Sequence, residues 1–358
     1  MALARSCGLT TVVAYLAAFL GGPENTLRQR LRELYQPAGV KSGANRSEFD
    51  PTACFPGLVR WAASGASDRR LVIALDVTNL GGRFTVLCAA VVYRGCALPV
   101  AWSVRPSERT GSWNDIWAGL LGRLREALGE GWEVLVLTDR GLESPALFRV
   151  ITAAGWHPLM RAKAAGTFRP AGWHKGHPMG RFARAAGRRW AGEGVAYKAA
   201  GSRLACTLLA CWEPGHAEPW LILTDLPAAG ADPAWYAWRM WVEHGFKDVK
   251  SGQWDWQRTR LTEAARAERQ WAAVAVATLW MVEVGGEGEA VAWPPVPAAA
   301  RSRRVLKRGL LRLWASLVHG LPLPGGRFLP TAPWAARGWD ADPLTEADVA
   351  EEHDVKAA

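Results

Sequence analysis

The pattern of hydrophobic and polar positions changes period along the chain. Residues 1–68 follow a helical period, with leucines recurring every three or four residues in NTLRQRLRELY. From residue 71 three β-rich runs follow, LVIALDVTNL, FTVLCAAVVY and CALPVAWSVR, separated by short glycine-containing breaks. Runs of this length at this spacing predict an antiparallel meander of three strands. Within residues 1–68, the segment NTLRQRLRELY predicts an amphipathic helix in either of two roles, a solvated surface helix or a DNA-contacting one.

Helical and strand patterns alternate after the meander. Residues 112–128 place apolar side chains on one broad helical face, and WEVLVLTDRG then reads as a strand buried on both faces. A helix at 144–154 and a strand in WHPLMRAKA come next. The order β-β-β-α-β-α-β is that of a ribonuclease H-like fold. We therefore predict an α/β protein with a ribonuclease H-like catalytic core and an N-terminal helical region.

Residues 165–227 interrupt this order. They begin as a loop-like, basic stretch containing tryptophan and histidine. Three strand-like runs follow, VAYKAAG, LACTLLACWE and PWLILTDL. Helical patterns resume at 232–250 and 262–284. The predicted domains are a helical DNA-binding region (1–68), the first part of the core (69–164), a β-rich insertion (165–227), the second part of the core (228–285), and a linker, basic helix and acidic tail (286–358).

The charge distribution suggests a polyanionic partner. The 358 residues hold 43 Lys and Arg against 33 Asp and Glu, and seven of the acids fall within residues 338–358. The first 337 residues retain 42 basic and 26 acidic residues, a net charge of +16. A surplus of this size favours nucleic acid as the partner.

The apolar runs and the cysteines indicate an intracellular protein. No run reaches the roughly 18 apolar residues of a membrane span, and residues 9–20 fit a buried helix better than a signal peptide. The six cysteines form no CxxC pair, which favours reduced thiols over disulfides or a zinc site. We expect a cytosolic location and no membrane partner.

Two aspartates stand out in apolar strands. Asp76 lies within LVIALDVT, where a charge costs several kcal/mol unless it is paired or binds a metal. Asp139 ends LVLTDRG, and in a ribonuclease H-like order both carboxylates would meet at one edge of the sheet. An exposed strand-edge position and a turn-forming role are the alternatives. Asp225 in LILTDLP competes with Asp139, but its surroundings fit a turn or cap.

A third carboxylate belongs to the helical segment WYAWRMWVEHGFKDVK. At about 100° per residue, five polar side chains fall within an arc of roughly 80°. They are Tyr236, Arg239, Glu243, Lys247 and Lys250. A solvated face is the ordinary explanation of such a stripe. Its mixture of a phenol, a carboxylate and three cations also suits a metal ligand flanked by phosphate binders, and Mg²⁺ prefers carboxylate oxygen.

Tyr236-x2-Arg239-x3-Glu243-x6-Lys250 resembles the Tyr-Arg-Glu-Lys signature of bacterial cut-and-paste insertion-sequence transposases with an Asp-Asp-Glu site. Asp76 in ALDVT and Asp139 in LTDRG resemble the two Asp motifs of that family. The resemblance covers roughly residues 25–285, including a β-strand insertion between the second Asp and the Glu. Glu143 departs from it, because many relatives have an aromatic residue there.

The resemblance implies a set of roles. Asp76, Asp139 and Glu243 would be catalytic and bind Mg²⁺, for which Mn²⁺ substitutes. Tyr236, Arg239 and Lys250 would hold phosphates of the transposon end, with Lys247 as a further candidate DNA contact. Relatives cleave DNA by way of a hairpin formed on the transposon end, in which a flipped base stacks on an aromatic side chain of the insertion. Trp173 and Trp190 are the candidates for this aromatic residue.

The implied function is excision and integration of an insertion sequence by two-metal-ion phosphoryl transfer. The partners would be transposon-end inverted-repeat DNA, target DNA and a second copy of the chain when assembled on DNA. The resemblance also implies a location in the bacterial cytoplasm, associated with the nucleoid. Two alternatives remain open. One is an inactive transposase-derived DNA-binding protein, and the other is a ribonuclease H-like nuclease without strand transfer.

Overall fold

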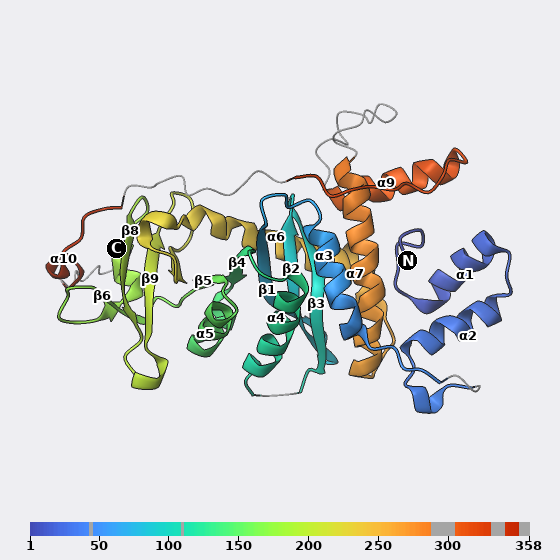
Figure 1. Cartoon of the computed structure of the whole chain (residues 1–358), viewed down its shortest axis with the longest axis horizontal. Coiled ribbons are helices and arrows are strands. Elements are labelled where there is room, and N and C mark those ends of the chain that lie inside the picture. Colours follow the sequence, from blue (N-terminus) through green and yellow to red (C-terminus); the bar gives the residue numbers. More distant parts are fainter. Residues whose placement is uncertain (43–45, 109–110, 288–304, 331–340, 351–358) are drawn as a thin grey trace, which may run out of the picture. The chain divides into compact units, whose positions relative to one another are not determined.

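The computed structural model describes residues 1–42, 46–108, 111–287, 305–330 and 341–350 (Figure 1). Contacts divide the chain into two units. The first consists of Met1–Trp132 and Met240–Ala332, and the second of Glu133–Arg239 and Pro333–Ala358. Most of the predicted linker at 286–300 lies outside the described residues.

Three long antiparallel strands form the sheet of the first unit, as the β-rich runs predicted. They are β1 (Arg70–Leu80), β2 (Phe84–Tyr93) and β3 (Cys96–Pro106). Asp76 of β1 pairs with Cys88 of β2, which in turn pairs with Trp102 of β3. The strands are buried almost throughout, so their apolar runs are continuous rather than alternating.

α-Helices make up most of the rest of the first unit. They are α1 (Leu9–Leu20), α2 (Glu24–Tyr35), α3 (Phe55–Ala63), α4 (Asn114–Leu128), α6 (Met240–Lys247), α7 (Ala264–Glu287) and α9 (Val305–Val318). The region 1–68 is helical as predicted. α7 packs on β3, where the indoles of Trp102 and Trp271 lie 6.4 Å apart and the Trp102 Nε1 donates to the Glu268 carbonyl at 2.9 Å. Among the described helices, none combines the length and hydropathy that a membrane span requires.

The crossing of α7 and α9 brings two backbones into contact. A Cβ added to Gly309 would lie 1.8 Å from the Met281 carbonyl oxygen, and one added to Gly285 would lie 2.0 Å from the Val305 carbonyl oxygen. No side chain fits at either position. Arg312 further along α9 donates to the Val284 carbonyl at 2.7 Å, which ties the two helices together beyond the glycines.

A buried guanidinium of α7 contacts the N-terminal region. Arg269 donates to the carbonyls of Tyr35 at 2.8 Å and Phe49 at 3.1 Å, and it also contacts the Glu48 carboxylate. Burial lowers the pKa of Arg269. Because these partners lie more than 200 residues away in sequence, Arg269 fixes the chain segment that links α2 to α3.

The sheet of the second unit begins with a parallel pair. β4 (Glu133–Thr138) pairs in parallel with β5 (His157–Arg161), and α5 (Pro145–Ala153) connects them. The order continues from β5 as β10-β9-β8-β6-β7. These strands are β6 (Thr167–Pro170), β7 (His177–Pro178), β8 (Arg189–Ala196), β9 (Leu204–Cys211) and β10 (Trp220–Thr224). The short helix α10 (Glu346–Ala350) belongs to the same unit.

The insertion is β-rich as predicted, but its first strands differ from the pattern. The run VAYKAAG was predicted as a strand, whereas β8 begins at Arg189 and ends at Ala196. β6 and β7 lie in the basic stretch that was predicted as a loop. Gly194 explains the difference, since its added Cβ would lie 2.2 Å from the Arg169 carbonyl oxygen of β6. The glycine that weakens the strand pattern is what permits the close pairing.

Candidate active site

Asp76 is a buried carboxylate in β1. Its side chain is 7% exposed, and its Oδ1 accepts a 2.8 Å hydrogen bond from the backbone N–H of Val77. The pKa of the neighbouring Cys88 thiol is raised, first by burial and then by the Asp76 charge. The exposed strand-edge alternative is therefore wrong for Asp76. A carboxylate held in a core strand requires compensating interactions, and the Val77 N–H supplies one of them.

Asp139 follows β4 directly and also has a local structural role. Its Oδ1 accepts a 3.0 Å hydrogen bond from the N–H of Leu142, which caps the short 3-10 helix Arg140–Leu142. A Cβ at Gly141 would lie 3.3 Å from that same oxygen. The turn leaves the Asp139 side chain 40% exposed, so a carboxylate oxygen remains accessible.

Two residues of the signature contact the end of β4. The hydroxyl of Tyr236 donates to the Thr138 carbonyl at 3.2 Å, and the Arg239 Nη2 lies 3.4 Å from the Asp139 Oδ2. Tyr236 and Arg239 are both buried. They lie on the 3-10 helix η7 (Pro233–Arg239), which begins where the Asp232 carboxylate accepts from the N–H of Ala234 at 2.8 Å. An Asp cap followed by Pro favours this start.

Glu243 lies on α6 in the first unit and is exposed. α6 packs against β3, β1 and β2. Gly245 allows the close approach, because a Cβ there would lie 3.0 Å from the Ala97 Cβ. Lys247 at the end of α6 is exposed, and Lys250 is partly exposed.

The predicted helical segment at 232–250 is confirmed, but it is not one regular α-helix. The segment is a 3-10 helix to Arg239, an α-helix to Lys247, and a π-helix over Asp248–Gly252. Because the angle per residue changes twice, the five polar side chains do not share one α-helical arc. The π turn ends where the N–H groups of Gln253 and Trp254 both donate to the Asp248 carbonyl. Trp254 is fully buried, and its indole N–H donates to Thr278, so the wide turn directs this ring into the core.

The three carboxylates are distributed between the units. Asp76 and Glu243 belong to the first and Asp139 to the second. Within the part of the chain that the structure describes, no group of three or more Asp, Glu, His or Cys side chains is arranged to hold a metal ion. Convergence of the three stays a prediction. As hard oxygen donors, they have the chemistry that Mg²⁺ requires.

The polar contacts around Asp139 include residues that the sequence did not single out. Glu218 accepts from Arg140 at 2.8 and 2.6 Å and from Arg161 at 2.7 Å. Arg140 directly follows Asp139, so this ion-pair network fixes the turn in which Asp139 lies. Glu218 precedes β10 in an irregular loop, where nothing in the local pattern predicts a long-range partner.

Asp225, the competitor of Asp139, has a partner of its own. Both of its carboxylate oxygens lie 3.1 Å from the Nδ1 of His157. The hydrogen bond to Asp225 is the main reason that the pKa of His157 is raised. Asp225 therefore links the end of β10 to the start of β5.

Glu143 connects separate parts of the second unit. Its carboxylate accepts from the N–H of Lys163 at 3.0 Å and from the Tyr197 hydroxyl at 2.8 Å. Burial, followed by the charge of Glu143 and its hydrogen bond, raises the pKa of Tyr197. The departure from the family pattern at Glu143 thus corresponds to a specific set of polar contacts.

The two candidate base-stacking aromatics differ in exposure. Trp190 is 6% exposed, and its ring centroid lies 4.4 Å from that of Phe182 and 6.0 Å from that of Phe168. It is a core residue, so the prediction for Trp190 is wrong. Trp173 is partly exposed and stacks on Phe182 with centroids 5.8 Å apart.

The fold and these motifs define an α/β protein with a ribonuclease H-like order of elements and a β-strand insertion. Residues 89–280 match the Transposase DDE domain family, and the chain belongs to that family. The match includes Asp139 and Glu243 and begins after Asp76.

Among solved structures, the chain is similar to a piggyBac transposase synaptic complex with hairpin DNA. The identity is 10% and the TM-score 0.35, over 70% of this chain and 53% of that one. This chain thus spans about half the length of that relative. No curated protein sequence matches it at a significant level.

Proposed function

We infer that the chain is a DNA transposase of the Tyr-Arg-Glu-Lys branch, which excises and integrates an insertion sequence by metal-assisted phosphoryl transfer. The observation that carries the proposal is the family match over residues 89–280, combined with signature residues that contact the end of β4 at Asp139. The partners are transposon-end inverted-repeat DNA and target DNA, on which two copies of the chain assemble.

Asp76, Asp139 and Glu243 would hold two divalent ions, Mg²⁺ with Mn²⁺ as a substitute. When bound, such ions activate the attacking oxygen and stabilise the leaving oxygen of the phosphodiester. The protein's contribution is to fix the carboxylates. The buried strand β1 fixes Asp76, the capped turn and Arg239 fix Asp139, and the packing of Gly245 on β3 fixes Glu243.

The cations nearby would bind DNA phosphates. Lys247 and Lys250 follow Glu243 on the same segment and are at least partly exposed. Without DNA, Tyr236 contacts Thr138 and Arg239 contacts Asp139. We propose that, when the transposon end binds, the Arg239 guanidinium contacts a DNA phosphate as well as Asp139. Trp173 remains the candidate aromatic of the insertion for a flipped base.

A matched pair of aspartates tests the proposal. Asp139 ends LVLTD and Asp225 ends LILTD, so Asp139→Asn and Asp225→Asn make the same change in nearly the same local sequence. The substrate is a linear fragment carrying the inverted repeats that bracket the gene, incubated with Mg²⁺. We expect Asp139→Asn and Glu243→Gln to abolish end cleavage while DNA binding survives, and Asp225→Asn to cleave.

Three outcomes are distinguishable. Cleavage by Asp139→Asn or Glu243→Gln would mean that the carboxylates are wrongly assigned. Binding without cleavage by the wild type would indicate an inactive transposase-derived DNA-binding protein. Cleavage without joining of the cut end to a target plasmid would indicate a nuclease that lacks strand transfer.

A further inference from the structure

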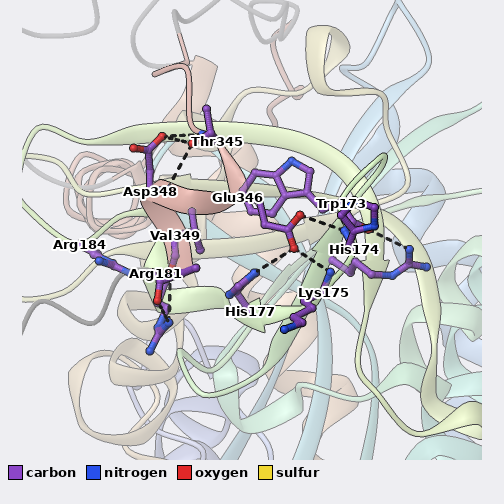
Figure 2. Close-up of polar contacts among 12 residues, drawn as sticks. Trp173, His174, Lys175, His177, Arg181, Arg184, Thr345, Glu346, Asp348 and Val349 are labelled. Atoms are coloured by element: carbon purple, nitrogen blue, oxygen red, sulfur yellow. Dashed lines mark hydrogen bonds and ion pairs between the residues drawn. The ribbon is translucent and has the colours of Figure 1, made fainter.

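A segment of the acidic tail lies on the basic face of the insertion (Figure 2). Glu346 of α10 makes the central contact. Its two carboxylate oxygens accept hydrogen bonds from consecutive backbone N–H groups, those of His174 at 3.1 Å and Lys175 at 2.9 Å. The Nε2 of His177 lies 3.7 Å from the Glu346 Oε1. Consecutive amides that converge on one anion form a nest, which is a common phosphate-binding arrangement in proteins.

Guanidinium groups surround the rest of the tail segment. Arg181 donates to the carbonyls of Val349 at 3.2 Å and Ala350 at 3.3 Å, and Arg184 donates to the Val349 carbonyl at 2.7 Å. Figure 2 shows both arginines directed at this end of α10. The side chain of Val349 is buried at the same place.

A second carboxylate of the tail contacts the start of β8. The Asp342 Oδ2 accepts from the Arg189 N–H at 2.9 Å and lies 3.8 Å from the Arg188 guanidinium. Asp342 in turn donates its N–H to the Arg189 carbonyl at 2.6 Å. Tail carboxylates therefore occupy two separate anion-binding points on the insertion.

The groups on this face are those that bind nucleic-acid backbones. In protein–DNA complexes, phosphate oxygens are contacted mainly by backbone N–H groups and by the side chains of arginine and lysine. Arginine can donate two parallel hydrogen bonds to one phosphate. The face contributes the amides of His174, Lys175 and Arg189 together with the side chains of Lys175, Arg181, Arg184 and Arg188. The tail segment that lies on it, residues 341–350, contains the acidic residues Asp342, Glu346 and Asp348. The backbone N–H groups of His174 and Lys175 also hold the pKa of Glu346 below its usual range, which favours the charged carboxylate.

We propose that this face of the insertion is a binding surface for DNA phosphates, and that the acidic tail occupies it as an internal competitor until DNA displaces it. The proposal rests on the proposed function, because it takes DNA as the partner. Each tail contact is a surface ion pair or a single hydrogen bond, and exposed pairs of this kind are weak individually. DNA presents many phosphates and gains from counterion release, so it can displace the tail.

The test uses the full chain and no metal, so that binding is separated from cleavage. The probe is a fluorescein-labelled 30-bp duplex of random sequence, with affinity measured by anisotropy in EDTA over a series of salt concentrations. The variant Asp342→Asn/Glu346→Gln removes both tail charges with little change of shape. The control Glu126→Gln/Glu130→Gln removes two exposed charges from the first unit.

We expect the tail variant to bind about tenfold more tightly than the control, with a salt slope steeper by about 0.9 for each phosphate newly contacted. Adding Arg181→Ala/Arg184→Ala to the tail variant should remove that gain. Equal affinity of tail variant and control, or an affinity that the two arginine substitutions leave unchanged, would overturn the proposal. Thermal melts of every variant establish that each is folded. Retained cleavage by Asp139→Asn would overturn the proposed function alone, because this binding assay needs no metal and no cleavage.

Discussion

The hydroxyl of Tyr236 donates a 3.2 Å hydrogen bond to the carbonyl oxygen of Thr138, the residue directly before Asp139. The two residues are 98 positions apart, and both are buried. A tyrosine that was singled out by its spacing to Arg239 and Glu243 therefore supports the strand end that carries Asp139. In this structure its role is to position the backbone.

Tyr236→Phe should lower the free energy of unfolding by about 1–2 kcal/mol, because the buried Thr138 carbonyl loses its donor. End cleavage should slow as well, since the end of β4 is less well fixed. Urea unfolding and a cleavage time course measure the two effects. Tyr15→Phe is the control, because Tyr15 is 41% exposed and should change stability by less than about 0.5 kcal/mol. A Tyr236→Phe protein as stable as the wild type would exclude the positioning role.

Lys250→Ala should reduce the slope of log affinity against log salt for transposon-end DNA by about 0.9, the value for one phosphate contact in duplex DNA. Lys250→Arg keeps the charge and should keep the slope. The measurement is a salt titration of binding without metal. If Lys250→Ala retains the wild-type slope, Lys250 belongs to a solvated face.

Gly245→Ala should slow cleavage more than it affects DNA binding. The added methyl would lie 3.0 Å from the Ala97 Cβ, so α6 must move away from β3 and carry Glu243 with it. Gly122→Ala in α4 is the matched control, since a Cβ there meets no atom within 4 Å. That substitution should raise the free energy of unfolding by about 0.5–1 kcal/mol, because alanine favours a helix interior. Equal cleavage rates in the two variants would show that the close packing of α6 is unimportant for Glu243.

The His157–Asp225 pair should make stability depend on pH. The hydrogen bond that the His157 ring donates to the Asp225 carboxylate raises the pKa of His157 above its ordinary 6.5 in the folded protein. Its contribution is then complete below pH 6.5 and is lost as the pH rises through the folded-state pKa. Asp225→Asn should therefore cost up to about 1 kcal/mol at pH 6 and progressively less at alkaline pH.

Urea unfolding at several pH values and an NMR titration of His157 check this sign. His319→Asn, at an exposed histidine, should show no such trend. A cost of Asp225→Asn that grows with rising pH would contradict the assignment.

The elements that could be predicted from the sequence are those with long uniform patterns. The meander of β1, β2 and β3, the helix α4 and the strand β4 all have continuous apolar runs or a wide apolar face, and the structure confirms them. The buried carboxylate of Asp76 could also be predicted, because a charged residue is conspicuous within an apolar strand sequence.

What could not be predicted depends on contacts distant in sequence. The segment around Glu243 changes helix type because Asp232 caps its start and Trp254 must reach the core, and neither fact alters a hydrophobic period. β8 contains Gly192 and Gly194, which lower strand propensity but make room for the Trp190 ring and for β6. The contact of Glu346 with His174 joins positions 172 residues apart.

The crossing of α7 and α9 limits which mutations the gene can tolerate. Every amino-acid change that one base can make in a glycine codon introduces a Cβ or a stop. At Gly309 that Cβ would overlap the Met281 carbonyl, and at Gly285 it would overlap the Val305 carbonyl. No single-base change at either codon gives a residue that fits. In a random library of this gene selected for folded protein, these two codons should therefore carry almost only synonymous changes.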